Sequence, residues 1–327
     1  MIAILGMALT AMAQSAGITL SSNGTLKFFR SDQFGDAIDA AQPNDTIYFA
    51  PGEYQINKLW EWDNWNSRKI TKPLVLIGAG GHENGTRFST SSSQSLYIDL
   101  SQYDTNNNFS MEGIRYNGGR IIVASDIDNL TFRNMYVQEF GYTVNDTVTA
   151  KVNNMLVDRC HITSEVELGN DRVASANFLN SKINNIKGSC TNNIPAANHC
   201  KLWNVDSSFT GFILNSFIRY GDVTNSSLEN CGYYSVSGVS ETNTKNSFNI
   251  GYDFDGYDDN PSQLDASYVS NDGTPMGTSG GDNPFSLYPS YPTPDVTKST
   301  IEYDVNNKKL NVTIKLLGAK ETETPAE

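Results

Sequence analysis

ILNSFIRYGDVTNSSL, residues 213–228, contains one six-residue pattern twice. In both copies, 213–218 and 223–228, the order is an apolar residue, any residue, Asn, Ser, any residue and an apolar residue. Alternation of apolar and polar side chains is typical of a strand with one buried face, because successive side chains of a strand point to opposite sides. The stretch therefore predicts short strands that meet at polar corners.

The same hexad recurs along the middle of the chain at a longer interval. Successive copies begin 21 to 25 residues apart, and the unit carries no helical stripe. A repeat of this length predicts a solenoid, in which each coil buries its apolar face against the neighbouring coils. The seven copies begin at Met111, Phe132, Val157, Phe178, Leu202, Val223 and Thr244.

Asparagine occupies the third position in five of the seven hexads. At a tight corner, Asn tolerates a left-handed backbone, and its amide is able to hydrogen-bond to the amide of the next coil. We expect a ladder along the stack, although the column would also arise by chance in a chain so rich in Asn. The predicted ladder residues are Asn134, Asn180, Asn204, Asn225 and Asn246.

Both ends of the repeat carry signals of their own. In SDQFGDAIDAAQPND, residues 31–45, Ser31 or Asp32 would cap a helix whose apolar side chains close the first coil. Near the other end, STIEYDVNNKKLNVTIKLL, residues 299–317, contains two alternating runs joined at two asparagines, which predicts a hairpin.

The N-terminal motifs identify a family resemblance. FGDAIDAAQPNDTIYFAPGEYQI, residues 34–56, followed by KPLVLIGAGG, residues 72–81, resembles the first coils of the right-handed parallel β-helix, or pectate-lyase-like, superfamily. NDGTPMGTSGGDNPFSLYPSYP, residues 271–292, is similar to the close of secreted β-helix proteins of Gram-negative bacteria, in which a Gly-Gly step and Pro-Phe leave the last coil. The resemblance covers about residues 26–290.

The resemblance implies an all-β fold: a right-handed parallel β-helix with an N-terminal capping helix and a short C-terminal β-hairpin extension. We expect the β-helix domain over residues 14–290 and a linker with the hairpin over residues 291–327. Residues 1–13 end in Ala-Met-Ala and are typical of a secretory signal, although its basic start is missing; the alternative is a buried N-terminal strand. We therefore expect a secreted, periplasmic or cell-surface protein, and a monomer.

The net charge limits the classes of partner, and the cysteines allow a disulfide. A net charge of −13 argues against a nucleic-acid partner, which would need clustered Lys and Arg, and no segment after the signal is long enough to span a membrane. Among the four cysteines, Cys190 and Cys200 bracket a polar loop that a disulfide would close; otherwise all four are small buried residues.

Catalytic motifs are hard to find. Family members that cleave acidic polysaccharides use either calcium with an Arg or Lys base, or three Asp residues with a His and a basic pair, and neither set is present as a motif. His161 and Arg159 are the weak candidates for an acid or base. Calcium is the one possible cofactor, on the acidic loop YDFDGYDDN, which is otherwise simply solvated. Its candidate ligands are Asp253, Asp255, Asp258 and Asp259.

A tryptophan-rich stretch offers a candidate carbohydrate contact. LWEWDNWNSRK, residues 59–69, combines flat aromatic faces with polar side chains, as sugar-binding surfaces do, or else packs its rings over the end of the core. The candidates are Trp60, Trp62, Trp65, Asp63 and Arg68. The expected function is binding of a polysaccharide or cell-surface glycan, or another surface interaction, without an evident catalytic set. The alternatives are a polysaccharide lyase or glycoside hydrolase that acts on an acidic polysaccharide, and a purely structural spacer.

Overall fold

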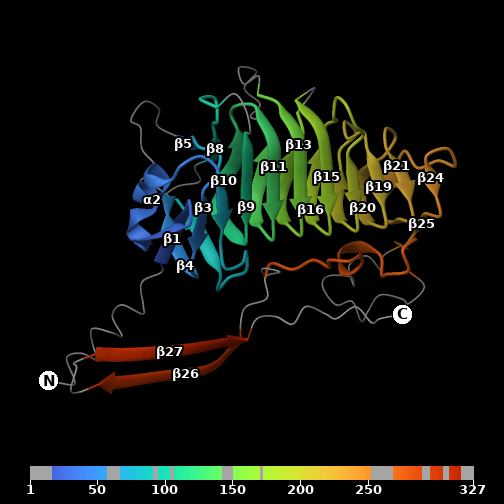
Figure 1. The fold of residues 1–327 in the computed structure, drawn as a ribbon. Coiled ribbons are helices and arrows are strands. Elements are labelled where there is room, and N and C mark those ends of the chain that lie inside the picture. Colours follow the sequence, from blue (N-terminus) through green and yellow to red (C-terminus); the bar gives the residue numbers. More distant parts are fainter. Residues whose placement is uncertain are drawn as a thin grey trace, which may run out of the picture. The chain divides into compact units, whose positions relative to one another are not determined.

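The computed structural model describes residues 17–56, 67–90, 95–103, 107–141, 150–169, 172–251, 268–288, 295–304 and 309–317. The chain divides into two compact units, Met1–Pro289 and Ser290–Glu327. The first unit is a parallel β-helix, in which the strands of successive coils lie side by side (Figure 1). The predicted all-β solenoid is therefore confirmed.

Two long sheets form the walls of the β-helix in the part of the chain that the structure describes. The first, sheet A, has 12 strands and is parallel except at β1, which pairs antiparallel with β2 and β3. In spatial order these strands are β2 (Thr25–Arg30), β1 (Gly17–Ser22), β3 (Thr46–Phe49), β6 (Val75–Ile77), β9 (Asn108–Glu112), β11 (Ile127–Arg133), β13 (Val152–Asp158), β15 (Val173–Leu179), β17 (Ala196–Asn198), β19 (Phe212–Leu214), β21 (Ser227–Glu229) and β24 (Thr244–Lys245).

Sheet B has 13 strands over the same described residues, and its pairs are parallel. Its main path runs through β4 (Gly52–Gln55), β7 (Thr86–Ser89), β10 (Ile114–Val123), β12 (Tyr136–Gly141), β14 (His161–Glu167), β16 (Lys182–Lys187), β18 (Lys201–Val205), β20 (Phe217–Asp222), β22 (Gly232–Tyr233) and β25 (Phe248–Asn249). Beside that path, β5 (Ser67–Ile70) pairs with β8 (Ser95–Ile98), which pairs with β10, and β23 (Val236–Ser237) pairs with β20.

The core is a set of apolar columns that run from coil to coil. Because strands pair in register, the same inward position recurs in each coil, and each inward side chain packs on the equivalent side chain of the next coil. Burying these side chains is the main force that holds the coils together, since a single coil has no interior of its own. One such column contains Leu76, Met111, Phe132, Val157, Phe178, Ala197, Ile213 and Leu228, each at most 2% exposed.

From β9 to β24, a left-handed residue turns the chain from each strand of sheet A into sheet B. These corner residues have φ between 46° and 63°, a region that favours Gly and Asn. The corner column contains Gly113, Asn134, Arg159, Asn180, His199, Asn215, Asn230 and Asn246.

The predicted ladder needs a correction. Asn134, Asn180 and Asn246 stand in the corner column, but Asn204 lies within β18 and Asn225 lies in the turn before β21. The reason is strand length: sheet A strands shorten from seven residues in β15 to three in β17, so the interval between corners falls from at least 21 residues to between 15 and 19. A fixed period of about 21 residues overshoots the later corners, which are His199, Asn215 and Asn230.

Amide ladders nevertheless form on both sheets. On the outer face of sheet A, Asn129 Nδ2 donates to Asn108 Oδ1 at 2.6 Å, and Asn154 Nδ2 donates to Asn129 Oδ1 at 3.0 Å. On sheet B, Asn204 Nδ2 donates to Asn185 Oδ1 at 2.7 Å. Each amide both donates and accepts, so it satisfies its neighbours in adjacent coils.

Cysteine and serine alternate at the buried position that follows the corner. Backbone N–H groups of Cys160, Cys200 and Cys231 donate to the hydroxyl oxygens of Ser181, Ser216 and Ser247 at 2.9 to 3.0 Å. All four thiols are free, so the predicted disulfide between Cys190 and Cys200 is wrong. The Cys200 side chain stays in this column, 3.4 Å from the carbonyl oxygen of Phe178, whereas Cys190 lies elsewhere in the coil, beside Val173.

The predicted helix closes the N-terminal end of the β-helix, but it begins at a different residue from the predicted one. A 3-10 turn, η1 (Ser31–Gln33), leads into α2 (Phe34–Ala40), whose N-cap is Gln33, so neither Ser31 nor Asp32 caps it. Phe34, Ala37 and Ile38 face the core. At the other end, the Lys72 ammonium donates to three carbonyl oxygens, those of Ile38, Asp39 and Ala41, and so satisfies the helix C-terminus.

The end of the first unit folds back along the stack. Residues 268–288, called the strap below, run along the corner column from the late coils toward the early ones (Figure 1). The resemblance implied that Gly280-Gly281 and Pro284-Phe285 leave the last coil; instead they lie against earlier coils. In the second unit, β26 (Asp295–Asp304) and β27 (Lys309–Leu317) form the predicted antiparallel hairpin.

Candidate functional site

An open groove lies on the outer face of sheet B, across β14, β16 and β18. Its volume is ≈ 230 Å³. Its polar side chains come from two outward positions of each strand, and isoleucines of β14 and β16 form part of its floor. The lining residues are His161, Ile162, Thr163, Lys182, Ile183, Asn184, Lys201 and Trp203.

Strand register places the basic groups in one row. His161 pairs with Lys182, and Lys182 pairs with Lys201, so three nitrogen-bearing side chains stand one above another at the strand spacing of about 4.8 Å. The next residue of each strand, Ile162, Ile183 or Leu202, points into the core. Alternation along the strand therefore fixes which side chains reach the groove.

The electrostatics of the row favour a neutral imidazole. Burial lowers the pKa of His161 to about 4, and the positive charges of Lys182, Arg115 and Lys201 act in the same direction. His161 is therefore uncharged near pH 7, while the lysines beside it carry positive charge.

Aromatic rings flank the row on both sides. Trp203 is 38% exposed, and the Arg219 guanidinium lies 3.8 Å from its ring centroid. At the other end, the Arg115 guanidinium lies 3.9 Å from the ring centroid of Tyr136, which meets His161 edge-on at 5.1 Å. Cation–π contacts of this kind hold both arginines against flat surfaces.

The strap forms one rim of the groove. The Lys182 ammonium lies 4.7 Å from the ring centroid of Phe285, and the same ring stands edge-on to His161 at 6.5 Å. Phe285 follows the groove residues by about a hundred positions in the sequence, so only the return of the strap brings it here.

Ion pairs line the second half of the sheet B strands. Glu139 is paired with Arg120 at 2.6 Å, and Glu165 is paired with Lys187 at 2.9 Å. Burial raises the pKa of Glu139, the charge of Glu165 acts in the same direction, and Arg120 opposes both. These carboxylates thus have basic partners of their own, apart from the row of His161, Lys182 and Lys201 that lines the groove.

The structure separates the two predicted catalytic residues. His161 lines the groove, whereas Arg159 occupies a corner, 8% exposed, where its guanidinium contacts Asp158 at 2.9 Å. The left-handed backbone at Arg159 interrupts the strand, so Arg159 and His161 do not share one outward face.

The other predicted site residues fall largely outside the described residues. These are Trp60, Trp62, Trp65 and Asp63 of the tryptophan-rich stretch, and Asp253, Asp255, Asp258 and Asp259 of the acidic loop. Arg68 lies in β5, and its side chain is outside the described part. Among the described residues, no group of three or more His, Cys, Asp or Glu side chains is arranged to hold a metal ion, and no helix is long and apolar enough to cross a membrane.

The lysines and Trp203 were missed by the search for catalytic motifs. A local signal does exist: a small residue, a basic residue and an apolar residue follow the corner at 160–162, 181–183 and 200–202. Aligning the corners places the three basic residues in one row. No family model, no curated protein and no solved structure matches the chain.

Proposed function

We propose that the protein binds an acidic polysaccharide along the outer face of sheet B. The observation that carries the proposal is the groove across β14, β16 and β18, where two lysines, a neutral histidine and an exposed tryptophan share one open surface. Basic groups gather here although the whole chain has a net charge of −13.

The charge of the groove supports an anionic ligand. Lys182 and Lys201 stand side by side on adjacent strands, so together they present two positive charges to a ligand in the groove. A carboxylate or sulfate group of a sugar would accept hydrogen bonds from both ammonium groups, and such charge-assisted bonds are stronger than neutral ones.

The shape of the groove supports a polymer over a small anion. Its outward side chains come from three adjacent strands about 4.8 Å apart, so an extended chain lying across them would meet a polar or aromatic group at each strand. Trp203 offers a flat apolar face for the C–H surface of a sugar ring, and Thr163 and Asn184 offer polar groups for hydroxyls. A role outside the cell, proposed from the N-terminal run of residues 1–13, fits a polysaccharide partner.

Titration calorimetry with oligomers of galacturonic acid, oligomers of guluronic acid and neutral cello-oligosaccharides tests the proposal. We expect acidic oligomers to bind and neutral ones not to. Lys201→Gln and Trp203→Ala should each weaken binding at least about tenfold, the size expected for losing a charge-assisted hydrogen bond or a central aromatic contact. Lys245→Gln is the matched control, because Lys245 is an exposed lysine paired with Glu229 on sheet A. Equal affinity of all three variants, or preference for the neutral sugars, would contradict the proposal.

A second candidate function is cleavage of the same polysaccharide by a lyase. The observation that favours it is the neutral imidazole of His161 beside two lysines. In such a step the neutral imidazole would take the C5 proton of a uronate whose carboxylate the ammonium groups neutralise. The C–H electron pair would form the C4=C5 double bond as the glycosidic C4–O bond breaks, and the departing oxygen would take a proton from water. Appearance of an unsaturated, ultraviolet-absorbing sugar that is lost in His161→Ala would favour the lyase. Binding without product would favour the binding protein.

A further inference from the structure

The strap covers the polar corners of the β-helix and uses its backbone to do so. Asn134 Nδ2 donates to the carbonyl oxygens of Ser286, at 2.6 Å, and Tyr288, at 3.0 Å. Asn180 Nδ2 donates to the carbonyl oxygen of Gly280 at 2.6 Å. These corner side chains are at most 7% exposed because the strap lies over them.

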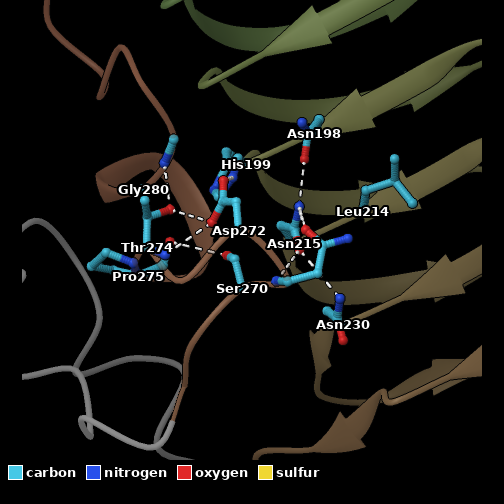
Figure 2. Close-up of polar contacts among 12 residues, drawn as sticks. Asn198, His199, Leu214, Asn215, Asn230, Ser270, Asp272, Thr274, Pro275 and Gly280 are labelled. Atoms are coloured by element: carbon cyan, nitrogen blue, oxygen red, sulfur yellow. Dashed lines mark hydrogen bonds and ion pairs between the residues drawn. The ribbon is translucent and has the colours of Figure 1, made fainter. Parts of the chain in front are cut away.

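The late coils hold the strap through a second set of polar contacts (Figure 2). Asn215 Nδ2 donates to Asn271 Oδ1 at 3.1 Å, and the backbone N–H of Asn271 donates back to Asn215 Oδ1 at 3.2 Å. His199 Nε2 lies 2.9 Å from Asp272 Oδ2, and the His199 side chain is only 3% exposed. The other carboxylate oxygen, Asp272 Oδ1, accepts from the backbone and hydroxyl of Thr274.

Close approach at His199 depends on glycine. A Cβ on Gly280 would lie 2.6 Å from His199 Nδ1 and 1.7 Å from the carbonyl oxygen of Pro275. Only the absence of a side chain lets the strap pass this corner and continue toward the early coils, where Gly81 N–H donates to the carbonyl oxygen of Leu287 at 2.7 Å.

Between these two anchor regions the strap delivers Phe285 to the groove. Its ring holds the Lys182 ammonium at 4.7 Å and lies edge-on to His161. The groove is open with the strap in place, and its lining contains no strap residue, so the strap forms a rim and not a plug.

We propose that the strap is a working part of the polysaccharide site: Phe285 contacts the bound sugar and orients Lys182, and Asp272 is a positioning residue that holds the strap through His199. The proposal rests on the proposed function, because it assigns strap residues to the same groove. It predicts that a change at Asp272, a strap residue that comes before Phe285 in the chain, alters binding in the groove.

The polar nature of the contacts makes this coupling sensitive to single changes. When the strap lifts, its polar groups bond to water instead, so each hydrogen bond adds only a small net stability. Because few such bonds hold the strap, the loss of one still raises the population of the lifted strap measurably. Met276 packs with Phe217 and Ile250 in the first half of the strap, and at its end the Tyr288 ring stacks on His82 at 4.1 Å. Loosening at Asp272 reaches the stretch that leads to Phe285 through Thr274, whose hydroxyl is held by Asp272 and accepts from the Gly281 N–H at 2.7 Å.

Hydrogen–deuterium exchange tests the latch without any ligand. In Asp272→Ala, the strap amides of Gly277, Gly281 and Phe285 should exchange about tenfold faster, the factor expected for losing one hydrogen bond to a charged group. Asp222→Ala is the matched control: Asp222 Oδ1 accepts from the backbone and hydroxyl of Thr224 at 2.9 and 2.6 Å, the same turn that Asp272 makes with Thr274, but it lies outside the strap. Unchanged strap exchange in Asp272→Ala would overturn the positioning role.

Calorimetry with the galacturonic and guluronic acid oligomers tests the contact. Phe285→Leu should weaken binding about tenfold, whereas Phe285→Tyr, which keeps the aromatic face, should bind as the unchanged protein does. Asp272→Ala should also weaken binding, and adding it to Phe285→Leu should cost no more than about a further twofold, because both act through one contact. If Phe285 has a purely structural role, Phe285→Leu should have a lower melting temperature, but its affinity for the oligomers should not depend on whether residue 285 is aromatic.

The outcomes separate the two proposals. If Lys201→Gln and Trp203→Ala lose binding while Phe285→Leu and Asp272→Ala bind normally, the strap is no part of the site and the proposed function stands. If the unchanged protein binds none of the acidic oligomers, the proposed function fails, and the assignment of Phe285 as a sugar contact fails with it; the exchange experiment then still decides whether Asp272 holds the strap.

Discussion

Asn134 and Tyr288 lie 154 residues apart in the chain, yet Asn134 Nδ2 donates to the carbonyl oxygen of Tyr288 at 3.0 Å. In a solenoid each coil otherwise contacts only its neighbours, so long-range contacts of this kind are few. The strap links the coil of Gly81 to that of Asn215 and therefore joins levels that do not touch each other. We expect it to make the unfolding of these coils more cooperative.

Replacing Asn134 should destabilise the first unit in a way that separates backbone from side chain. Asn134→Ala loses two hydrogen bonds to the strap and forces Ala into the left-handed region, a combined cost of about 2–4 kcal/mol. Asn134→Gly loses the same bonds but keeps the backbone relaxed, so it should cost less. Urea unfolding followed by circular dichroism measures both, and equal losses would mean that backbone strain plays no part.

Truncation in the core column should be costly. Phe178 is fully buried between Val157 and Ala197 of the adjacent coils, so Phe178→Ala should lower the free energy of unfolding by about 3–5 kcal/mol. The exposed Phe212, on the outer face of sheet A, is the control, and Phe212→Ala should cost less than about 1 kcal/mol. A similar loss at both positions would contradict the assignment of inner and outer faces.

The thiols should be unreactive in the folded protein. Burial raises the pKa of both Cys200 and Cys231 to about 12, so almost no thiolate is present near pH 7. A thiol reagent should label these two cysteines only after denaturation, and reduction should leave the mass of the protein unchanged. Rapid labelling without denaturant, or a mass shift on reduction, would contradict the buried Ser–Cys column.

His161 should make stability fall with acidity. Its folded pKa, about 4, lies below the usual 6.5, so the unfolded state takes up a proton first as the pH drops. Stability from this group is complete above pH 6.5, declines between 6.5 and 4, and declines no further below that. Urea unfolding near pH 7 and near pH 5 should show a smaller difference for His161→Gln than for the unchanged protein. An identical difference would mean that His161 is not buried as described.

The sequence predicts that the chain forms coils with polar corners, but it does not predict how many residues each coil contains. Alternation and the recurrent Asn mark the corners at Asn134 and Asn180, because strand pairing and left-handed turns are local preferences. The shorter late coils shift the corners to His199 and Asn215, and a constant period cannot follow that change. His199 departs from the Asn pattern at its corner, where its side chain contacts Asp272 of the strap.

The sequence predicts only some of the residues that line the groove. His161 was found as a candidate, but Lys182 and Lys201 gain meaning only when the corners are aligned and their strands are paired. The path of the strap was not predictable, because its backbone carbonyls accept hydrogen bonds from Asn side chains that lie 100 or more residues earlier in the chain. Patterns of neighbouring residues do not predict contacts over such distances in the chain.

Crystals of the protein soaked with an oligomer of galacturonic or guluronic acid test the central claim most directly. The account predicts sugar density along the outer face of sheet B, with a carboxylate between the ammonium groups of Lys182 and Lys201 and a ring against Trp203. Sugar bound at another face, with this groove empty in the same crystals, would contradict it.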